Sequence, residues 1–180
     1  VIGVPLGVIA SYNKWYRDIQ NVVLDAMQTL PYFCYLIPVL MFFGGNIVSA
    51  VIATVIYSVP PIIRLTALGL SQVSGGYSEV SKSFGGTGIQ TLNKVKFPLA
   101  VPSLVMGFNQ TVIMAFAMQI VTPLIGGKGL GLQVFNALQR SDTGRGLSAG
   151  LAIVLLAIII DRITHAWTKK QRQALGLNQS

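Results

Sequence analysis

Long apolar runs separated by short polar and basic segments constrain the fold of this chain more than any other feature. Residues 99–122 and 146–168 are each long enough to cross a bilayer, which takes about 20 mostly apolar residues in one helix. Charged residues make up 10% of the chain, whereas a soluble domain carries about 25%. Because a backbone in lipid must satisfy its own hydrogen bonds, such runs predict helices. The sequence therefore predicts an all-α, multi-span integral membrane bundle.

Proline and glycine mark the expected ends of the spans. We place the spans at residues 1–11, 29–43, 47–65, 99–122 and 146–168. The first is too short to cross a bilayer, so we interpret it as the inner end of a span whose beginning is missing. Pro60 and Pro61 predict a kink or a helix restart, because proline lacks a backbone donor and clashes with the preceding turn. Residues 12–28 are expected to hold a short interfacial helix, and residues 169–180 a basic cytoplasmic tail.

The distribution of lysine and arginine indicates the orientation. Cytoplasmic loops carry an excess of these residues. With the polar segment at residues 77–98 in the cytoplasm, ten of the thirteen basic residues lie inside and three lie outside. The three outside residues are Lys128, Arg140 and Arg145. The opposite topology would reverse these numbers, so we expect the 77–98 segment to be cytoplasmic.

The polar segment at residues 77–98 has the pattern of two short helices joined by a bend. Tyr77, Val80 and Phe84 recur at helical spacing. The glycines that follow, Gly85 among them, accept positive φ at little cost and allow a sharp turn. A second short helix is expected to run to Phe97, where Pro98 would stop it and begin the next helix.

The spacing within this segment resembles the cytoplasmic signature of permeases from ATP-binding cassette (ABC) importers. The matching residues are Glu79, Val80, Ser81, Gly85, Val95, Phe97 and Pro98. The family usually has two alanines after the glutamate, and leucine where Phe97 stands. The resemblance implies that the segment is a coupling loop, which docks into a cleft on an ATP-hydrolysing subunit. We expect Glu79 and Gly85 to hold its shape, and exposed residues such as Lys82 and Ser83 to contact the ATPase.

Further stretches resemble the glycine betaine/proline betaine permeases of that family. They are residues 24–31, 35–38, 60–66, 108–111, 127–131 and 160–162. The resemblance implies a type I importer permease domain over residues 1–168, in a bacterial or archaeal cytoplasmic membrane. It also implies three kinds of partner: a second, identical permease copy, an extracytoplasmic substrate-binding protein, and two ATPases that hold ATP and Mg. Choline, carnitine and trimethylamine N-oxide remain alternative substrates, because the same architecture serves them.

The sequence contains no recognisable catalytic or metal-binding motif. The glycine-rich run at residues 126–131 is similar to a phosphate-binding loop, but Gly129 stands where a Walker A motif needs Ser or Thr. The single cysteine, Cys34, excludes an intramolecular disulfide and a metal site built on cysteines. Basic residues are scattered among short segments, which argues against a nucleic-acid-binding face. We therefore expect a transport subunit that is not an enzyme and holds no cofactor of its own.

Three polar residues in the 99–122 span are candidates for the translocation path. Asn109, Gln110 and Gln119 lie at bilayer depth, where polar side chains face other helices or a water-filled passage. Hydrogen bonding between helices is the alternative, and the sequence does not decide between them. A fragment of an ion-driven secondary transporter would need carboxylates near the bilayer centre, and only Asp161 comes close. A structural subunit without a passage is the third class considered.

Overall fold

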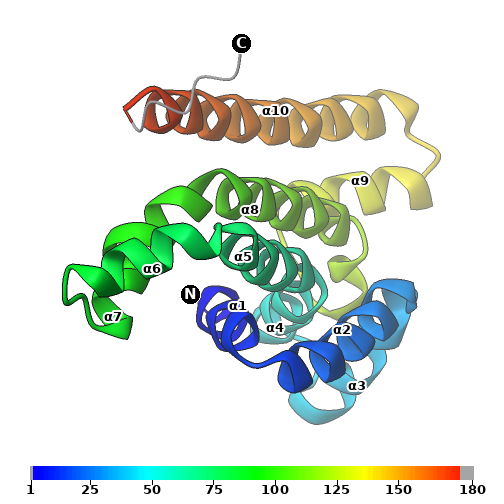
Figure 1. Cartoon of the computed structure of the whole chain (residues 1–180). Helices are drawn as coiled ribbons and strands as arrows, with labels where there is room; N and C mark the ends of the chain where they lie inside the picture. Colours follow the sequence, from blue (N-terminus) through cyan, green and yellow to red (C-terminus); the bar gives the residue numbers. More distant parts are fainter. Residues whose placement is uncertain (1, 175–180) are drawn as a thin grey trace.

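The computed structural model describes the backbone of residues 2–174 and the side chains of residues 2–170. Every regular element in that part of the chain is helical (Figure 1). The α-helices are α1 (Gly3–Tyr12), α2 (Lys14–Thr29), α3 (Phe33–Phe43), α4 (Ile47–Ser58), α5 (Pro60–Gln72), α6 (Gly75–Ser83), α7 (Gly88–Thr91), α8 (Phe97–Gln119), α9 (Leu130–Gln139) and α10 (Thr143–Ala174). A π-helical segment, η1 (Leu92–Lys96), and a 3₁₀ turn, η2 (Thr122–Ile125), complete the chain.

Helices α5 and α8 form the centre of the bundle, and glycine allows their close approach. A Cβ atom on Gly69 would lie 2.6 Å from the Cβ of Ser103, a distance that real Cβ contacts do not reach. Leu70, Ala100 and Leu104 are buried together at this crossing. Helix α1 packs on α5 in the same way, with Gly7 against Thr66. Figure 1 shows α10 beyond α8, on the side away from α1.

Three helical stretches are long and apolar enough to cross a membrane. They are Ile47–Gln72, Gly88–Gln119 and Thr143–Lys170. Helices α2 and α3 meet at 96° and pass the same test as a bent pair, which would make a fourth span. The chain is thus a multi-pass membrane protein, as predicted.

The second half of the 47–65 span extends further than expected. Val59 separates α4 from α5, and Pro60 stands at the first position of α5, where its missing N–H costs no hydrogen bond. The predicted restart at the two prolines is confirmed. The helix then continues to Gln72, seven residues past the predicted end, because nothing between Arg64 and Gln72 interrupts it.

The 29–43 span begins later than expected. Thr29 belongs to α2, and Leu30 is extended because it precedes Pro31, a position that disfavours helical ψ. Helix α3 therefore starts at Phe33, and Pro38 lies inside it without ending it.

Pro98 does not stop a helix, contrary to the sequence-based expectation. Residues 88–119 form one continuous helical stretch. In the π-helical turn, the N–H of Phe97 donates to the carbonyl of Leu92, and the helix widens where Pro98 enters it. Pro98 falls in the first turn of α8, which tolerates proline. This span ends at Gln119, not at Thr122.

The last span also has different bounds from those predicted. Helix α10 begins at Thr143 and runs to Ala174, so residues 169–174 continue the helix and do not form a separate tail. Lysine, arginine and glutamine are good helix formers, which explains the extension. The rest of the predicted tail, residues 175–180, lies outside the described residues.

Candidate functional site

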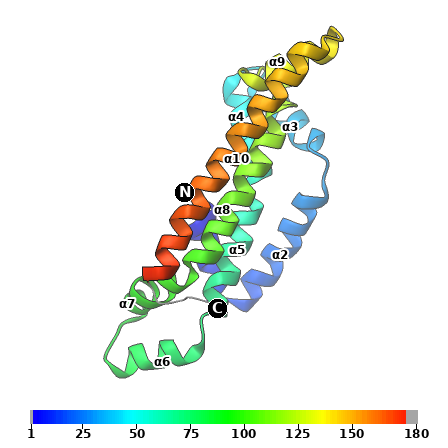
Figure 2. The same cartoon turned by 90° about the horizontal axis from the view of Figure 1, so that it is seen from above.

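The loop at residues 77–98 projects from one end of the bundle. Figure 2 shows α6 and α7 at that end and α9 at the opposite end. Helix α6 begins after Ser74, whose hydroxyl caps it, and ends before Gly85. The two predicted short helices are therefore present, although the second merges with α8.

Gly85 and Ser81 hold the bend of this projecting loop. Gly85 has φ +77°, in the left-handed region that glycine adopts without strain. The N–H of Gly86 donates to the carbonyl of Ser81 over 2.9 Å. The hydroxyls of Ser81 and Thr91 lie 2.8 Å apart and connect α6 to α7. The bend is thus fixed by hydrogen bonds within residues 81–91.

The projecting loop exposes an apolar face. Phe84 is 88% exposed, and Tyr77, Val80 and Ile89 are exposed as well. A cavity of about 480 Å³ lies beside them and also touches Val95. An exposed apolar face on a polar segment that projects from the end of the bundle is typical of a surface that a partner covers.

The other residues predicted to matter for coupling divide between the exposed part of the projecting loop and its base. Glu79, Lys82 and Ser83 are exposed, and the carboxylate of Glu79 makes no hydrogen bond to any described residue. Phe97 packs against the buried cluster of Leu70, Ala100 and Leu104 and anchors the loop to the bundle. That Glu79 holds the shape of the loop stays a prediction.

The three candidate path residues do not lie together. Asn109 is buried, and its Nδ2 donates to Oδ1 of Asp161 on α10 over 3.1 Å. Gln110 is exposed, and Gln119 lines a separate cavity of about 260 Å³ with Lys128 at the other end of the bundle. Asn109 therefore has the interhelical hydrogen bond that was the alternative to a path role.

A polar cleft between α2 and α5 was missed by the sequence analysis. It has a volume of about 430 Å³. Its lining consists of Arg17, Asn21, Asp25, Arg64, Ala67, Leu68 and Ser71. The guanidinium of Arg64 donates to the carboxylate of Asp25 and forms an ion pair across the cleft. The available signal was the i, i+4, i+8 spacing of Arg17, Asn21 and Asp25, which puts them on one helix face.

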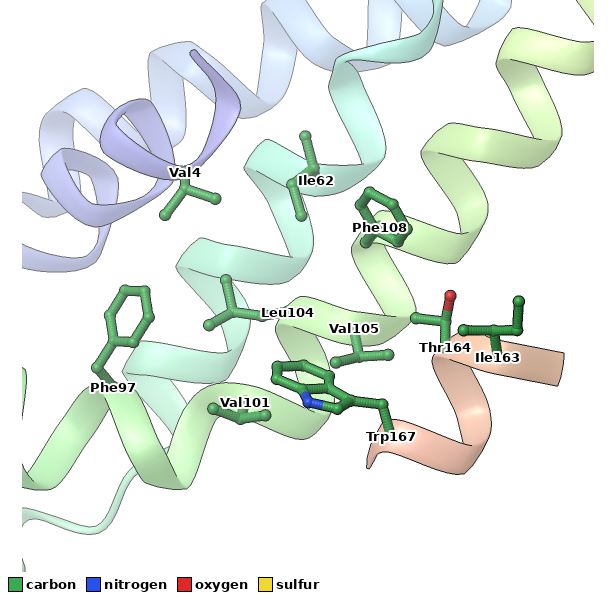
Figure 3. A pocket seen from close by; sticks show the side chains of 10 residues that line it. All are labelled: Val4, Ile62, Phe97, Val101, Leu104, Val105, Phe108, Ile163, Thr164 and Trp167. Atoms are coloured by element: carbon green, nitrogen blue, oxygen red, sulfur yellow. The ribbon is translucent and has the colours of Figure 1, made fainter. Parts of the chain in front are cut away.

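An apolar cleft of about 530 Å³ lies between α1, α5, α8 and α10. Figure 3 shows side chains from these four helices around it, including Val4, Ile62, Phe108 and Trp167. Thr164 is the sole hydroxyl among the lining residues, and it donates to the carbonyl of Ile160. This cleft offers a polar ligand no charged group.

Comparisons with known proteins agree with the predicted family. The family described as "Binding-protein-dependent transport system inner membrane component" matches residues 3–173. The glycine betaine/carnitine transport permease protein GbuB of Listeria monocytogenes is 45% identical over 96% of this chain and 61% of its own length. The glycine betaine/proline betaine transport system permease protein ProW of Escherichia coli is 44% identical over 96% of this chain and 49% of its own length. The chain thus spans about half of the length of these curated relatives.

A solved structure shows the same fold. A chain from a structure of the MetNI methionine ABC transporter in an inward-facing conformation aligns with a TM-score of 0.74, over 92% of this chain and 85% of that chain. The identity is 23%, so this likeness concerns the fold alone. The all-α bundle of the type I importer permease kind is confirmed. From the family match over nearly its whole length, the chain belongs to the binding-protein-dependent transport system inner membrane components.

Proposed function

We propose that this chain is the membrane-spanning permease part of an ATP-driven importer for glycine betaine and related osmolytes. Helices would move the substrate by alternating access, and a separate ATPase would supply the energy. The observation that carries the proposal is the projecting loop. It combines a rigid bend at Gly85 with an exposed apolar face, and it belongs to a chain of the transport family.

The ATPase partner is supported by the chemistry of the projecting loop. Large exposed aromatic side chains such as Phe84 are typical anchors of protein interfaces. The base of the projecting loop is continuous with α8, so a movement of the loop would be transmitted directly to this central helix. A partner can shift the permease between two states only by binding them with different affinity. A rigid loop would move together with its spanning helix, so the ATPase would meet the loop in a different position in each state and bind the two states unequally.

The substrate class is supported by the relatives. GbuB and ProW, which are 45% and 44% identical to this chain, are both named as glycine betaine permeases. We propose the same class here, delivered by an extracytoplasmic binding protein to two permease copies in a cytoplasmic membrane. The projecting loop would then face the cytoplasm, in agreement with the excess of basic residues at that end. ATP and Mg would bind the ATPase, not this chain.

The test is uptake of labelled glycine betaine by proteoliposomes that contain the full-length permease, its ATPase and its binding protein. ATP-dependent accumulation supports the proposal. Choline, carnitine and trimethylamine N-oxide as competitors rank the substrates. Uptake that ignores ATP and follows an ion gradient would overturn the importer assignment. ATP-driven import of a different solute, without betaine uptake, would keep the permease and reject the substrate.

Two glycines provide a matched test of coupling. Gly85→Val places a β-branched residue at φ +77°, which strains the bend. Gly88→Ala adds a methyl group in open space at the start of α7. We expect Gly85→Val to lose most ATP-driven uptake and Gly88→Ala to retain it. Full uptake by Gly85→Val, with the ATPase still bound, would reject the role of the loop.

A further inference from the structure

We propose that the polar cleft between α2 and α5 is a binding site for a zwitterionic osmolyte, with Arg64 receiving its carboxylate and Asp25 its ammonium group. This inference rests on the proposed function and deepens it, because it assigns contacts for the substrate within the membrane domain. The sequence analysis placed the candidate path residues on α8 instead.

The cleft has the shape of a polar track along two antiparallel helices. On α2, Arg17, Asn21 and Asp25 follow one another at intervals of one helical turn. On α5, Ser71 and Arg64 line the same cleft in the opposite order, so that Arg17 lies toward Ser71 and Asp25 meets Arg64. Figure 2 shows α2 running beside α5 from the end that carries the projecting loop.

The Asp25–Arg64 pair lies at the deep end of this track. Arg64 precedes the end of α5 at Gln72 by two turns, about 12 Å along the helix. Tyr12, which immediately precedes the turn into α2, lies near the loop end, because its ring is 5.3 Å from Nζ of Lys96. Polar and charged groups at such depth are costly unless they face a partner or a water-filled cavity. The cleft is a polar cavity of this kind, and its lining extends from the Asp25–Arg64 pair to Arg17 and Ser71, nearer the loop end.

The charges in the cleft do not balance. The lining of the cleft holds two guanidinium groups, those of Arg17 and Arg64, but a single carboxylate, that of Asp25, which pairs with Arg64. Within the described residues Arg17 has no ion-pair partner, and Nε of Arg64 is buried without a hydrogen bond. The cleft thus carries an excess of positive charge that attracts an anionic group, and the unbonded Nε of Arg64 leaves a donor free for it beside Asp25.

Glycine betaine has the matching chemistry. Its carboxylate and its trimethylammonium nitrogen are separated by a single methylene, so both charges must be met at neighbouring positions. A guanidinium binds a carboxylate through two parallel hydrogen bonds. The trimethylammonium group has no N–H to donate, so it needs only a nearby negative charge. A directly paired Arg64 and Asp25 supply both charges within reach of one small molecule.

The pair is accessible to an incoming ligand. The side chain of Arg64 is 37% exposed and that of Asp25 is 63% exposed. Exposed ion pairs contribute little to stability, about 0–1 kcal/mol, so a ligand that replaces the pair has little energy to overcome. The cleft volume of about 430 Å³ falls within the range of about 300–1,000 Å³ that is usual for small-molecule sites. We expect weak, reversible binding, as a transport site requires.

Protection of a reporter cysteine tests the site. The full-length permease with its ATPase carries Cys34→Ser and Asn21→Cys, and is placed in nanodiscs of phosphatidylglycerol, which has no zwitterionic headgroup. An uncharged, water-soluble maleimide labels the reporter in the presence of glycine betaine, choline, acetate or isosmotic sucrose. We expect glycine betaine to slow labelling several-fold, and choline, acetate and sucrose to do so much less. A second reporter, Thr164→Cys in the apolar cleft, should be unaffected by all four.

Variants separate binding from a structural role. Arg64→Lys keeps the charge and should retain protection at higher betaine concentration, because lysine lacks the bidentate geometry. The double variant Arg64→Gln/Asp25→Asn removes both charges of the pair together, so neither is left without its partner; it should fold, yet lose protection completely. Undiminished protection in the double variant would overturn the proposal, as would equal protection by sucrose or no protection by betaine. With Arg64 and Asp25 intact, ATP-driven betaine uptake without protection of the reporter would show that only the site is wrong. Absence of ATP-driven betaine uptake by that same protein would reject the proposed function itself.

Discussion

The polar cleft and the apolar cleft have similar volumes, about 430 and 530 Å³, but opposite chemistry. Helix α5 contributes to both: Ile62 lines the apolar cleft and Arg64 the polar one, two residues further along. Positions two apart on a helix differ by about 200° and point to nearly opposite sides, so one helix can separate two environments. The larger cleft is not the better site for an osmolyte, because a zwitterion there would lose water without gaining a partner.

The comparison also shows what each cleft can exchange with its surroundings. The apolar cleft suits hydrocarbon, whether from lipid or from another helix, since its lining carries no charge. The polar cleft suits water and solutes. If this contrast is correct, equivalent changes in the two clefts should have unequal effects, which the following variants measure.

The largest expected effect comes from a polar residue in the apolar cleft. Leu104 is 9% exposed and part of a buried cluster, whereas Leu68 lines the polar cleft and is 44% exposed. Leu104→Asn should destabilise the fold by about 2–5 kcal/mol, the range for a lost core leucine. Leu68→Asn should change stability by much less. Thermal unfolding of the purified complex checks both, and equal losses would contradict the contrast between the clefts.

An intermediate effect is expected from the ion pair. Asp25→Asn or Arg64→Gln alone leaves one charge without its partner, and each should lower stability by about 1 kcal/mol or less, because both side chains are more than one third exposed. The double variant should recover part of the loss. A double-mutant cycle of thermal midpoints measures the coupling. A coupling of several kcal/mol would identify the pair as a structural clamp and speak against an exchangeable binding site.

The smallest effect is expected at Asn109. Asn109→Leu removes the hydrogen bond to Asp161, and interhelical hydrogen bonds of this kind contribute about 0.6 kcal/mol. Asp161 keeps His165, whose Nε2 lies 3.4 Å from its Oδ1. Gln110→Leu, at the exposed neighbouring position, is the control and should have no effect on stability. A loss of betaine uptake in Asn109→Leu, with stability retained, would restore this residue as a path candidate.

Local patterns were sufficient to predict the helical bundle and the bend of the projecting loop. Apolar run length identified the spans, and Gly85 identified the turn that its positive φ requires. Span boundaries were less predictable, because a proline in the first turn of a helix and one that ends a helix look alike in sequence. Pro98 is the example: the π-helical turn before it absorbs the disruption.

The site could not be predicted from local patterns, since it depends on which helices meet. Asp25 and Arg64 are 39 residues apart, and only the antiparallel packing of α2 on α5 joins them. Helical spacing likewise identified Tyr77, Val80 and Phe84 as one face without indicating that this face is exposed. Both cases share one cause: periodicity groups residues on a face, but tertiary structure decides what that face contacts.

The most direct test of the two-cleft account is the water accessibility of paired cysteines. In a Cys34→Ser background, Ser71→Cys reports on the polar cleft and Thr164→Cys on the apolar cleft. The complex is labelled in nanodiscs, without ligand, with a water-soluble maleimide and with a lipid-soluble one. The account predicts that Ser71→Cys reacts readily with the water-soluble reagent, while Thr164→Cys reacts only with the lipid-soluble reagent. Equal reaction of both cysteines with the water-soluble reagent, or the reverse preference, would contradict it.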